Sequence, residues 1–518
     1  MKGSFLRSTS IVGAMTLLSR VSGLVRDMMY SRMFGTSPAM EAFLVAFKIP
    51  NFLRRITGEG AFSQAFVPVV SEYKLKREHA EVNALVAGVS GTLGLLLFVA
   101  TAIGVLAAPV VIFLYAPGFE SSGDRHDLAV EMFRWMFPYI FFISLTALGA
   151  GVLNTYGRFG TAAFNSVILN VVMIVFATWI APHFARPGIG LAVGVFVAGV
   201  IQLIAQFRGL SRLGLLSWPR WAWRDPGVRR IGKLMLPGIF GSSVAQVSLL
   251  LDTWVASFLL AGSFSWMYYA DRLVEFPMGV FSIALATVIL PGLSAHHAAA
   301  SPERFNATLD WALRLTCLVS LPAAVGLLML AGPLIAAIYG YGKFGARDVD
   351  MASYALMAYS LGLMGFSLVK VLAPGYFARQ DTRGPVRIGI IALSVNIAFN
   401  LVVVVPASRL GFPAPHALLA LATGLGAYVN TWLLYRGLVK SGVYVPTARW
   451  RQFAWQMLAA NLAMAAFLWW ASGGWSEWVA WRATARIFRL ALCVAGGGGV
   501  YAAVLWLTGL RLRDLRAV

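Results

Sequence analysis

The sequence predicts an all-α, polytopic membrane protein with 14 transmembrane helices: two pseudo-symmetric six-helix lobes around a central cavity, plus two C-terminal helices. Composition is the first reason, because 59% of the 518 residues are hydrophobic and 12% are charged, about half the ~25% typical of soluble proteins. The second reason is the length of apolar runs such as 86–111 and 162–180, which match the roughly 17 to 25 residues that span hydrocarbon. The third is an internal repeat.

Each apolar run is predicted to be a helix, because lipid offers the backbone no hydrogen-bonding partner and the alternating pattern of a membrane barrel is missing. The predicted spans are residues 9–34, 41–70, 84–114, 129–153, 161–181, 188–209, 231–261, 266–293, 307–338, 351–377, 385–405, 415–439, 452–471 and 486–508. An even number of spans places both termini on one side. Lys and Arg gather in the loops of that side, near 74–77, 212–233, 379–387 and 511–516, so we expect both termini to be cytoplasmic.

The repeat relates the first and seventh spans and the second and eighth. The segment GAFSQAFVPVVS at 60–71 resembles GVFSIALATVILPGLS at 279–294. The distance along the chain from Asp27 to Asp252 is similar to the distance between these two segments. We therefore predict an N-terminal lobe at 1–212, a cytoplasmic linker at 213–228, a C-terminal lobe at 229–440, and two extra helices with a tail at 441–518. Two halves around a site near the midplane are typical of transporters.

The net charge of +21 does not indicate a nucleic-acid partner, because the basic residues lie in short loops rather than in a soluble domain. Cys317 and Cys493 lie in apolar segments without metal-ligand spacing, so we expect them to pack. The first segment begins like a signal peptide. Its charges at Arg20, Arg26 and Asp27 favour a helix that is retained. No catalytic constellation is evident, and we expect a transporter rather than an enzyme.

Charged residues interrupt the first two spans. Each would cost roughly 2.5 to 3.5 kcal/mol at the bilayer centre if it faced lipid, so they predict a polar cavity. The set comprises Arg20, Arg26, Asp27, Glu41, Lys48, Arg54, Arg55 and Glu59. In the second span, Glu41, Lys48, Arg55 and Glu59 share one helical face. The seventh and eighth spans add Asp252, Asp271, Arg272 and Glu275.

Two interpretations of these charges remain open. The twelve groups divide into six basic and six acidic residues, so they can pair internally or extend toward the interface. Alternatively, Arg20, Arg26 and Lys48 outnumber the nearby carboxylates, and a cavity with excess Arg suits a phosphorylated anion.

Amide side chains form a second candidate site. Asn396 and Asn400 are four residues apart in the eleventh span, and Thr423 lies in the twelfth. Buried amides usually bind a neighbouring helix. Together with Asp252, however, these oxygens also form a candidate metal site for sodium.

Three long segments resemble the MurJ (MviN) family of bacterial lipid II flippases, within the superfamily of multidrug and oligosaccharidyl-lipid exporters. They are VSGLVRDMMYSRMFG at 21–35, AFKIPNFLRRITGEGAFSQAFVPV at 46–69 and YYADRLVEFPMGVFSIALATVILPGLS at 268–294. The resemblance covers essentially the whole chain. It implies a multi-pass protein of the bacterial inner membrane, with lipid II (undecaprenyl-diphosphate-MurNAc-pentapeptide-GlcNAc) and membrane lipids as partners, and we expect a monomer.

The resemblance also implies residue roles. The essential cavity arginines of the family match Arg20, Arg26 and Arg272, and Lys48 and Arg55 complete the predicted substrate-binding set. Salt-bridge or gating roles are implied for Asp27, Glu41, Glu59, Asp271 and Glu275. The sodium site described in some members matches Asp252 and Asn396, whereas Asn400 stands where a carboxylate is expected.

The implied mechanism is alternating access, in which the arginines hold the diphosphate and the last two helices, at 452–471 and 486–508, hold the lipid tail in a groove. An inside-negative potential favours outward movement of an anion by about 2.3 kcal/mol per charge per 100 mV, and an ion gradient is a further driving force. No ATP motif is needed.

Other functions predict other residues. An exporter of another polyprenyl-linked oligosaccharide would share this cavity, whereas a cation-coupled drug antiporter would have an acidic, aromatic one. An intramembrane enzyme acting on polyprenyl phosphates would have metal-binding carboxylates at loop edges, as DxxD or DxD, and we expect no such set.

Overall fold

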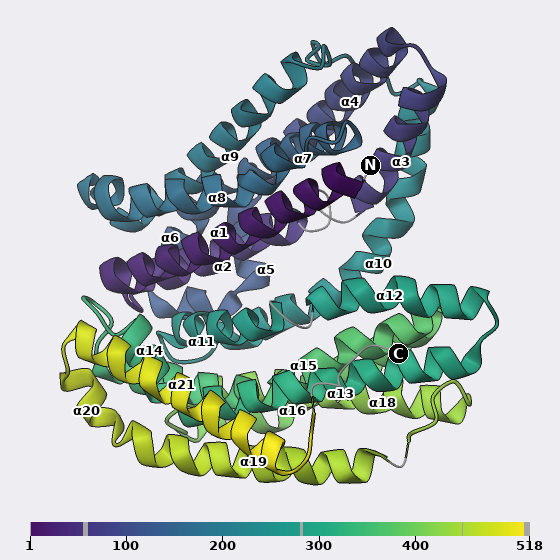
Figure 1. Ribbon diagram of the computed structural model, residues 1–518. Helices are drawn as coiled ribbons and strands as arrows, with labels where there is room; N and C mark the ends of the chain where they lie inside the picture. Colours follow the sequence, from purple (N-terminus) through teal and green to yellow (C-terminus); the bar gives the residue numbers. More distant parts are fainter. Residues whose placement is uncertain (1, 55–60, 280–282, 448, 512–518) are drawn as a thin grey trace. The chain divides into compact units, whose positions relative to one another are not determined.

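The computed structural model describes residues 2–54, 61–279, 283–447 and 449–511, and every element within these ranges is helical. The chain divides into two compact units, unit 1 at residues 1–261 and unit 2 at residues 262–518. Figure 1 shows the path of the helices within each unit. Ten helical segments in the described part are long and apolar enough to cross a membrane. The four remaining predicted spans, which hold the charged residues, are not among them, and the count of 14 stays a prediction.

The described residues of unit 1 form ten α-helices. They are α1 (Lys2–Phe34), α2 (Pro38–Arg54), α3 (Ala61–Lys76), α4 (His79–Leu106), α5 (Ala108–Tyr115), α6 (Arg125–Met136), α7 (Tyr139–Thr155), α8 (Phe159–Val175), α9 (Pro187–Ser211) and α10 (Pro226–Ala256). Short turns of other helix types are η2 (Pro117–Ser122), η3 (Phe176–Ile180) and η4 (Ala181–His183). Helix α1 packs on α8, α2 on α6, α7 on α9, and α3 on α10. Aromatic and branched apolar side chains of α3, α4 and α7 form a core with the start of α10.

Unit 2 contains the other eleven α-helices. They are α11 (Ser263–Pro277), α12 (Ile283–Ala298), α13 (Pro302–Met329), α14 (Ala331–Ile338), α15 (Ala346–Phe377), α16 (Arg383–Phe399), α17 (Val405–Arg409), α18 (Pro415–Lys440), α19 (Arg449–Ser472), α20 (Trp475–Ala480) and α21 (Ala483–Leu507), with η6 (Asn400–Val404) between α16 and α17. Helices α13, α15 and α18 pack together, and α19 and α21 pack on each other and on α13.

Proline and glycine mark many helix ends. Pro187, Pro226, Pro302 and Pro415 begin α9, α10, α13 and α18, where a missing N–H breaks no helical hydrogen bond. After α18, Gly442 has φ of 69°, a left-handed conformation that ends helices and that glycine adopts without a Cβ clash.

The two halves of the chain have the same succession of elements. Helices α4 and α5 have 28 and 8 residues, as do α13 and α14. Helices α8 and α16 each have 17 residues and continue into a five-residue π-helix, η3 and η6. The second and eighth predicted spans are each formed by two helices. The local structure therefore repeats as the sequence repeat predicts.

Helix α10 packs with α3 inside unit 1, although it begins the second half of the repeat. The predicted boundaries of the linker and the two lobes are not tested by this grouping and stay a prediction.

Candidate functional site

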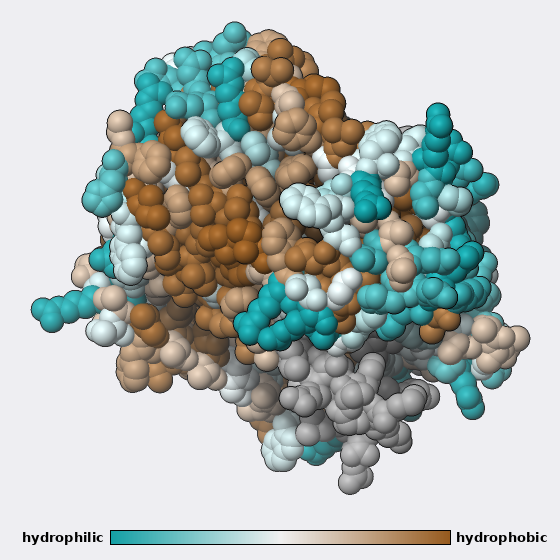
Figure 2. All heavy atoms as spheres, turned by 90° about the horizontal axis from the view of Figure 1, so that it is seen from above, coloured by the Kyte–Doolittle hydropathy of each residue, from teal (hydrophilic) through white to brown (hydrophobic). Residues whose placement is uncertain are grey.

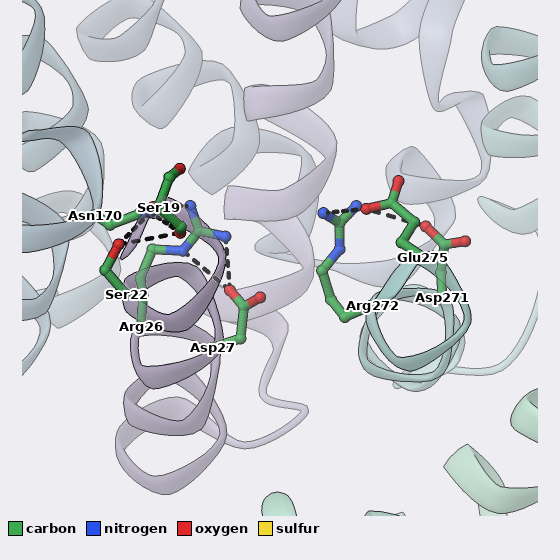
Figure 3. Close-up of polar contacts among 8 residues, drawn as sticks. All are labelled: Ser19, Ser22, Arg26, Asp27, Asn170, Asp271, Arg272 and Glu275. Atoms are coloured by element: carbon green, nitrogen blue, oxygen red, sulfur yellow. Dashed lines mark hydrogen bonds and ion pairs between the residues drawn. The ribbon is translucent and has the colours of Figure 1, made fainter. Parts of the chain in front are cut away.

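Arg26 lies at the centre of a polar group in unit 1, where α1 meets α8. Its Nε and Nη2 atoms donate to Oδ1 of Asp27 at 3.0 and 2.7 Å, and its Nη1 donates to Oδ1 of Asn170 at 2.9 Å (Figure 3). The side chain is 14% exposed, and the guanidinium carbon is 5.5 Å from the centre of the Tyr30 ring. Three donors in a planar fork thus hold the cation in one orientation.

Asn170 fixes this orientation. It is buried on α8, and its amide nitrogen donates to the carbonyl oxygen of Ser19 and to Oγ of Ser22, both at 3.0 Å. Ser19, Ser22 and Arg26 lie on one face of α1, so the amide oxygen is left to accept from Arg26. Sequence reasoning missed Asn170. Its signal was an amide inside the apolar run of the fifth span, where Asn165 and Asn170 are the two asparagines.

The other two predicted cations of this region have different surroundings. Arg20 is half-buried, and its side chain makes no hydrogen bond or ion pair among the described residues. Lys48, on α2, donates from Nζ to Oγ1 of Thr253 on α10 at 3.0 Å. Helix α10 also carries the half-buried Asp252. Among the described cations of the predicted set, Arg20 thus differs from Arg26, Lys48, Arg54 and Arg272, each of which has a side-chain partner.

Glu41 forms an ion pair with a residue that the sequence did not suggest. It is 1% exposed, and Oε2 accepts from Nη1 of Arg125 at 3.0 Å. Arg125 begins α6 and places its guanidinium 5.0 Å from the ring of Phe119. Sequence reasoning treated this region as a loop and so overlooked Arg125. This ion pair joins α2 to α6, and the gating or salt-bridge role of Glu41 in transport stays a prediction.

The remaining members of the predicted stripe on the second span are only partly described. Arg54 donates from Nε and Nη2 to Oδ1 of Asn51 at 3.1 and 2.9 Å, so it bonds within its own helix. Arg55 and Glu59 lie outside the described residues.

In unit 2, Arg272 lies between two carboxylates on α11. Its Nη1 is 2.8 Å from Oε2 of Glu275, and its Nη2 is 3.5 Å from Oδ2 of Asp271 (Figure 3). The guanidinium carbon lies 5.1 Å from the ring centre of Tyr268. The side chains of this triad are 30 to 41% exposed, so water reaches them more readily than it reaches Arg26. Arg272 therefore contacts both of the other predicted charges of the eighth span.

The structure brings together two residues of the predicted sodium site. Asn400 Nδ2 donates to Oδ1 of Asn396 at 3.0 Å, and both side chains are buried. Asn400 begins the π-helix η6, a type of turn that is frequent at functional sites. Thr423 Oγ1 donates to the carbonyl oxygen of Leu419 within α18. Among the described residues, no three His, Cys, Asp or Glu side chains form a metal site.

Two acidic spacings were overlooked: Asp-x-x-Asp at Asp124 and Asp127, where α6 begins, and Asp-x-Asp at Asp348 and Asp350, near the start of α15. The expectation that the chain has no such spacing was wrong. The side chain of Asp348 has a structural role, because Oδ2 accepts from the Gly345 amide at 3.0 Å and Oδ1 accepts from Nε1 of Trp266 at 2.9 Å. These bonds cap the helix and join it to α11.

The sequence is similar to proteins of known family over its whole length. A family profile described as lipid II flippase MurJ matches residues 30–488. A probable lipid II flippase MurJ of Vibrio cholerae is 44% identical, with 99% of this chain and 98% of that protein aligned. A lipid II flippase MurJ of Burkholderia cenocepacia is 43% identical, with 99% of each chain aligned.

Solved structures agree in fold. A lipid II flippase MurJ in an inward closed conformation superposes with a TM-score of 0.78 at 23% identity, over 97% of this chain and 99% of that one. An inward-facing multidrug transporter of the MATE family superposes with a TM-score of 0.56 at 15% identity, over 81% and 98% of the two chains. The predicted all-α membrane fold and the predicted resemblance are confirmed. Together, the profile, the relatives and the fold establish that this chain belongs to the MurJ family of lipid II flippases.

Proposed function

We propose that this protein moves lipid II from the cytoplasmic to the outer leaflet of the bacterial inner membrane by alternating access. The family profile, which matches residues 30–488, supports the substrate, and the relatives aligned over nearly the whole chain support the same activity. In this proposal the protein is a transporter and not an enzyme, acts as a monomer, and has both termini in the cytoplasm.

The observation that carries the proposal is the set of acceptors that the Arg26 guanidinium bonds to. Its fork is held by one carboxylate and one neutral amide, Asp27 and Asn170. A diphosphate oxygen has the geometry to replace the Asp27 oxygen, because guanidinium binds carboxylate and phosphate in the same two-pronged way. Exchange costs less than breaking a bond outright, since one charged acceptor replaces another.

The other residues have roles that follow the same logic. Arg20, Lys48, Arg55 and Arg272 are proposed to contact the anionic headgroup together with Arg26. Carboxylates released from them would form new salt bridges and favour the loaded, outward-opening state. This gating set comprises Asp27, Glu41, Glu59, Asp271 and Glu275. The drive is the membrane potential, an ion gradient, or both, and the tail of the lipid would follow the C-terminal helices α19 and α21.

Sodium coupling is a separate part of the proposal. The bonded pair Asn396 and Asn400 brings two side-chain amides together, whose oxygens are of the kind that hard cations prefer, and Asp252 and Thr423 are the other proposed ligands. Sodium should raise the melting temperature of the purified protein more than potassium does. That difference should disappear in Asp252→Ala and Asn396→Ala. A sodium effect that survives both substitutions would remove this site.

The central test is complementation of a bacterium depleted of its own lipid II flippase. Arg26→Ala and Arg272→Ala should abolish growth and outer-leaflet exposure of lipid II while the protein stays in the membrane. Arg26→Lys should remain impaired, because an ammonium keeps the charge but loses the fork. The matched control is Arg186→Ala, which removes an exposed arginine paired with Glu131 and should grow normally. Full growth of both cavity variants would contradict the proposed anion site.

A further inference from the structure

The segment between α9 and α10 presents large aromatic side chains to the surroundings. Trp218 is 89% exposed, Trp221 is 57% exposed and Trp223 is 49% exposed. The rings of Trp221 and Trp223 stack with centroids 6.2 Å apart and planes 13° apart. Three exposed indoles within six residues are unusual on a water-facing loop, because apolar surface is normally buried.

The backbone of this segment is held firmly against α4. The amide of Arg220 donates to the carbonyl oxygen of Ala87 at 2.9 Å, and the amide of Ala222 donates to Oγ1 of Thr92 at 3.0 Å. Gly91 permits this approach, because a Cβ atom there would lie 2.3 Å from the Arg220 carbonyl oxygen. The segment therefore has a fixed depth along α4, and the tryptophans are held at that depth.

That depth coincides with the edge of a lipid-facing surface. One turn beyond Thr92, the same side of α4 becomes exposed and apolar at Leu95 and Val99, and exposed apolar residues continue through α5 to Leu114. The last 12 residues of α4, Leu95 to Leu106, rise about 18 Å at ~1.5 Å per residue, and α5 follows directly after Ala107 and continues the exposed apolar surface. Figure 2 shows a broad hydrophobic area on one face of the molecule, with hydrophilic residues concentrated outside it.

The charges of the segment complement anionic headgroups. Arg220 and Arg224 alternate with the tryptophans, and both are exposed. The one carboxylate from 212 to 230, Asp225, accepts hydrogen bonds from the amides of Gly227 and Val228 and so caps α10. Neither Arg220 nor Arg224 forms an ion pair with a described residue, and the five arginines from 212 to 230 outnumber this one carboxylate.

From this placement we propose that residues 216–224 form an interfacial anchor that binds anionic phospholipids. The indoles occupy the headgroup boundary, where an apolar ring and a polar N–H are both satisfied, and the arginines contact lipid phosphate. Because α10 follows directly, the anchor fixes the depth of the cytoplasmic end of α10. This inference does not rest on the proposed transport activity.

The first test measures depth with a nitroxide label on Pro219→Cys in the full-length protein, in vesicles of phosphatidylcholine and phosphatidylglycerol. Cys317→Ala and Cys493→Ala remove the native thiols. Val99→Cys gives the lipid reference and Glu78→Cys the water reference. Oxygen accessibility at Pro219→Cys should fall between the two references. A value equal to that of the Glu78→Cys label would overturn the anchor, and would leave a soluble protein partner as the better explanation of the exposed tryptophans.

The second test separates the roles of the rings and the charges. Combined Trp218→Ser, Trp221→Ser and Trp223→Ser should move the label toward water, whereas the control Trp432→Ser, at an exposed tryptophan of α18, should not. If the arginines bind anionic lipid, the label at Pro219→Cys should lie deeper in vesicles that contain phosphatidylglycerol than in vesicles without it. Arg220→Gln with Arg224→Gln should abolish this difference in oxygen accessibility. Millimolar inorganic phosphate, added to vesicles without phosphatidylglycerol, should not change the oxygen accessibility of the label as phosphatidylglycerol does. If it does, the arginines bind a soluble anion and the lipid proposal is wrong.

Discussion

Buried charge in unit 1 is neutralised side chain by side chain. Arg26 bonds to Asp27 and Asn170, and Glu41 bonds to Arg125, with every one of these side chains at most 14% exposed. The two groups differ in the charge of the partners. Glu41 and Arg125 are both charged and join two helices. Arg26 has a neutral amide as its second acceptor, and in the proposed mechanism this makes its exchange to a substrate anion easier.

Asn170 offers a direct test of that difference. Asn170→Asp adds a carboxylate 2.9 Å from Arg26 Nη1, so the guanidinium would be held by two anions and released less readily. We expect reduced complementation with an unchanged or raised melting temperature. Asn170→Ala, which removes the amide, should lower both. Wild-type growth of Asn170→Asp would show that release of Arg26 does not limit transport.

Removing one partner of the buried pair should cost more than removing both. Glu41→Gln leaves the Arg125 cation buried without a carboxylate, which typically costs about 3 to 5 kcal/mol. Adding Arg125→Met should recover part of that loss. The exposed pair of Glu131 and Arg186 is the control, where Glu131→Gln should cost under about 1 kcal/mol. Thermal unfolding of the three purified variants and the wild type measures these losses, and equal losses at Glu41 and Glu131 would contradict this account.

At the scale of elements, polar contacts decide where the last two helices attach. Asp310, 1% exposed on α13, accepts from Tyr444 Oη at 2.7 Å and from Trp450 Nε1 at 2.6 Å, and it pairs with Arg314. Tyr444 lies in the connection that leads from α18 to α19, and Trp450 lies in the first turn of α19. One carboxylate therefore holds the start of the α19 and α21 pair against α13.

Asp310→Asn should loosen this attachment. The neutral amide is a weaker acceptor for Tyr444 and Trp450 and leaves Arg314 without its carboxylate. We expect faster proteolysis of the 441–447 connection and a loss of complementation. Asn306→Ala is the control, because Asn306 bonds only to the exposed Val445 backbone of the same connection. If both variants are cleaved equally fast, Asp310 is not the principal attachment.

At the scale of the whole molecule, the repeat and the packing divide the chain at different places. The elements repeat from α10 onward, yet α10 packs in unit 1 against α3. At the ends of these two helices, Arg230 Nη1 donates to Oε2 of Glu72 at 2.8 Å. That bond, with a smaller effect of Lys76, holds the pKa of Glu72 below its usual value.

The Glu72 bond predicts a small pH dependence. Because the carboxyl pKa is lowered in the folded state, its stabilising effect is complete above the usual value of 4.5 and is lost as the pH falls through the lowered value. Glu72→Gln should therefore reduce the melting temperature near neutral pH and flatten its acid dependence. The control Glu120→Gln, at an exposed carboxylate elsewhere in unit 1, should do neither. If the melting temperature of Glu72→Gln falls in acid as it does in the wild type, the bond does not hold α3 to α10.

Much of this protein was determined by the sequence alone. Hydropathy along the chain predicted the long helices of the described residues, although not α20 or most of α17, and charge in the first, second and eighth spans marked the regions around Arg26, Glu41 and Arg272 as polar. These features are local, because the cost of burying a charge or a backbone amide in lipid is the same wherever the helix packs.

Only the tertiary structure decided which helices meet. It placed Asn170 against Arg26, Arg125 against Glu41, and the 217–224 segment along α4. None of these pairings has a sequence pattern, because each depends on how two helices rotate and cross rather than on the residues of either one. The partner of a buried charge is therefore found in the packing, whereas the need for a partner is already present in the sequence.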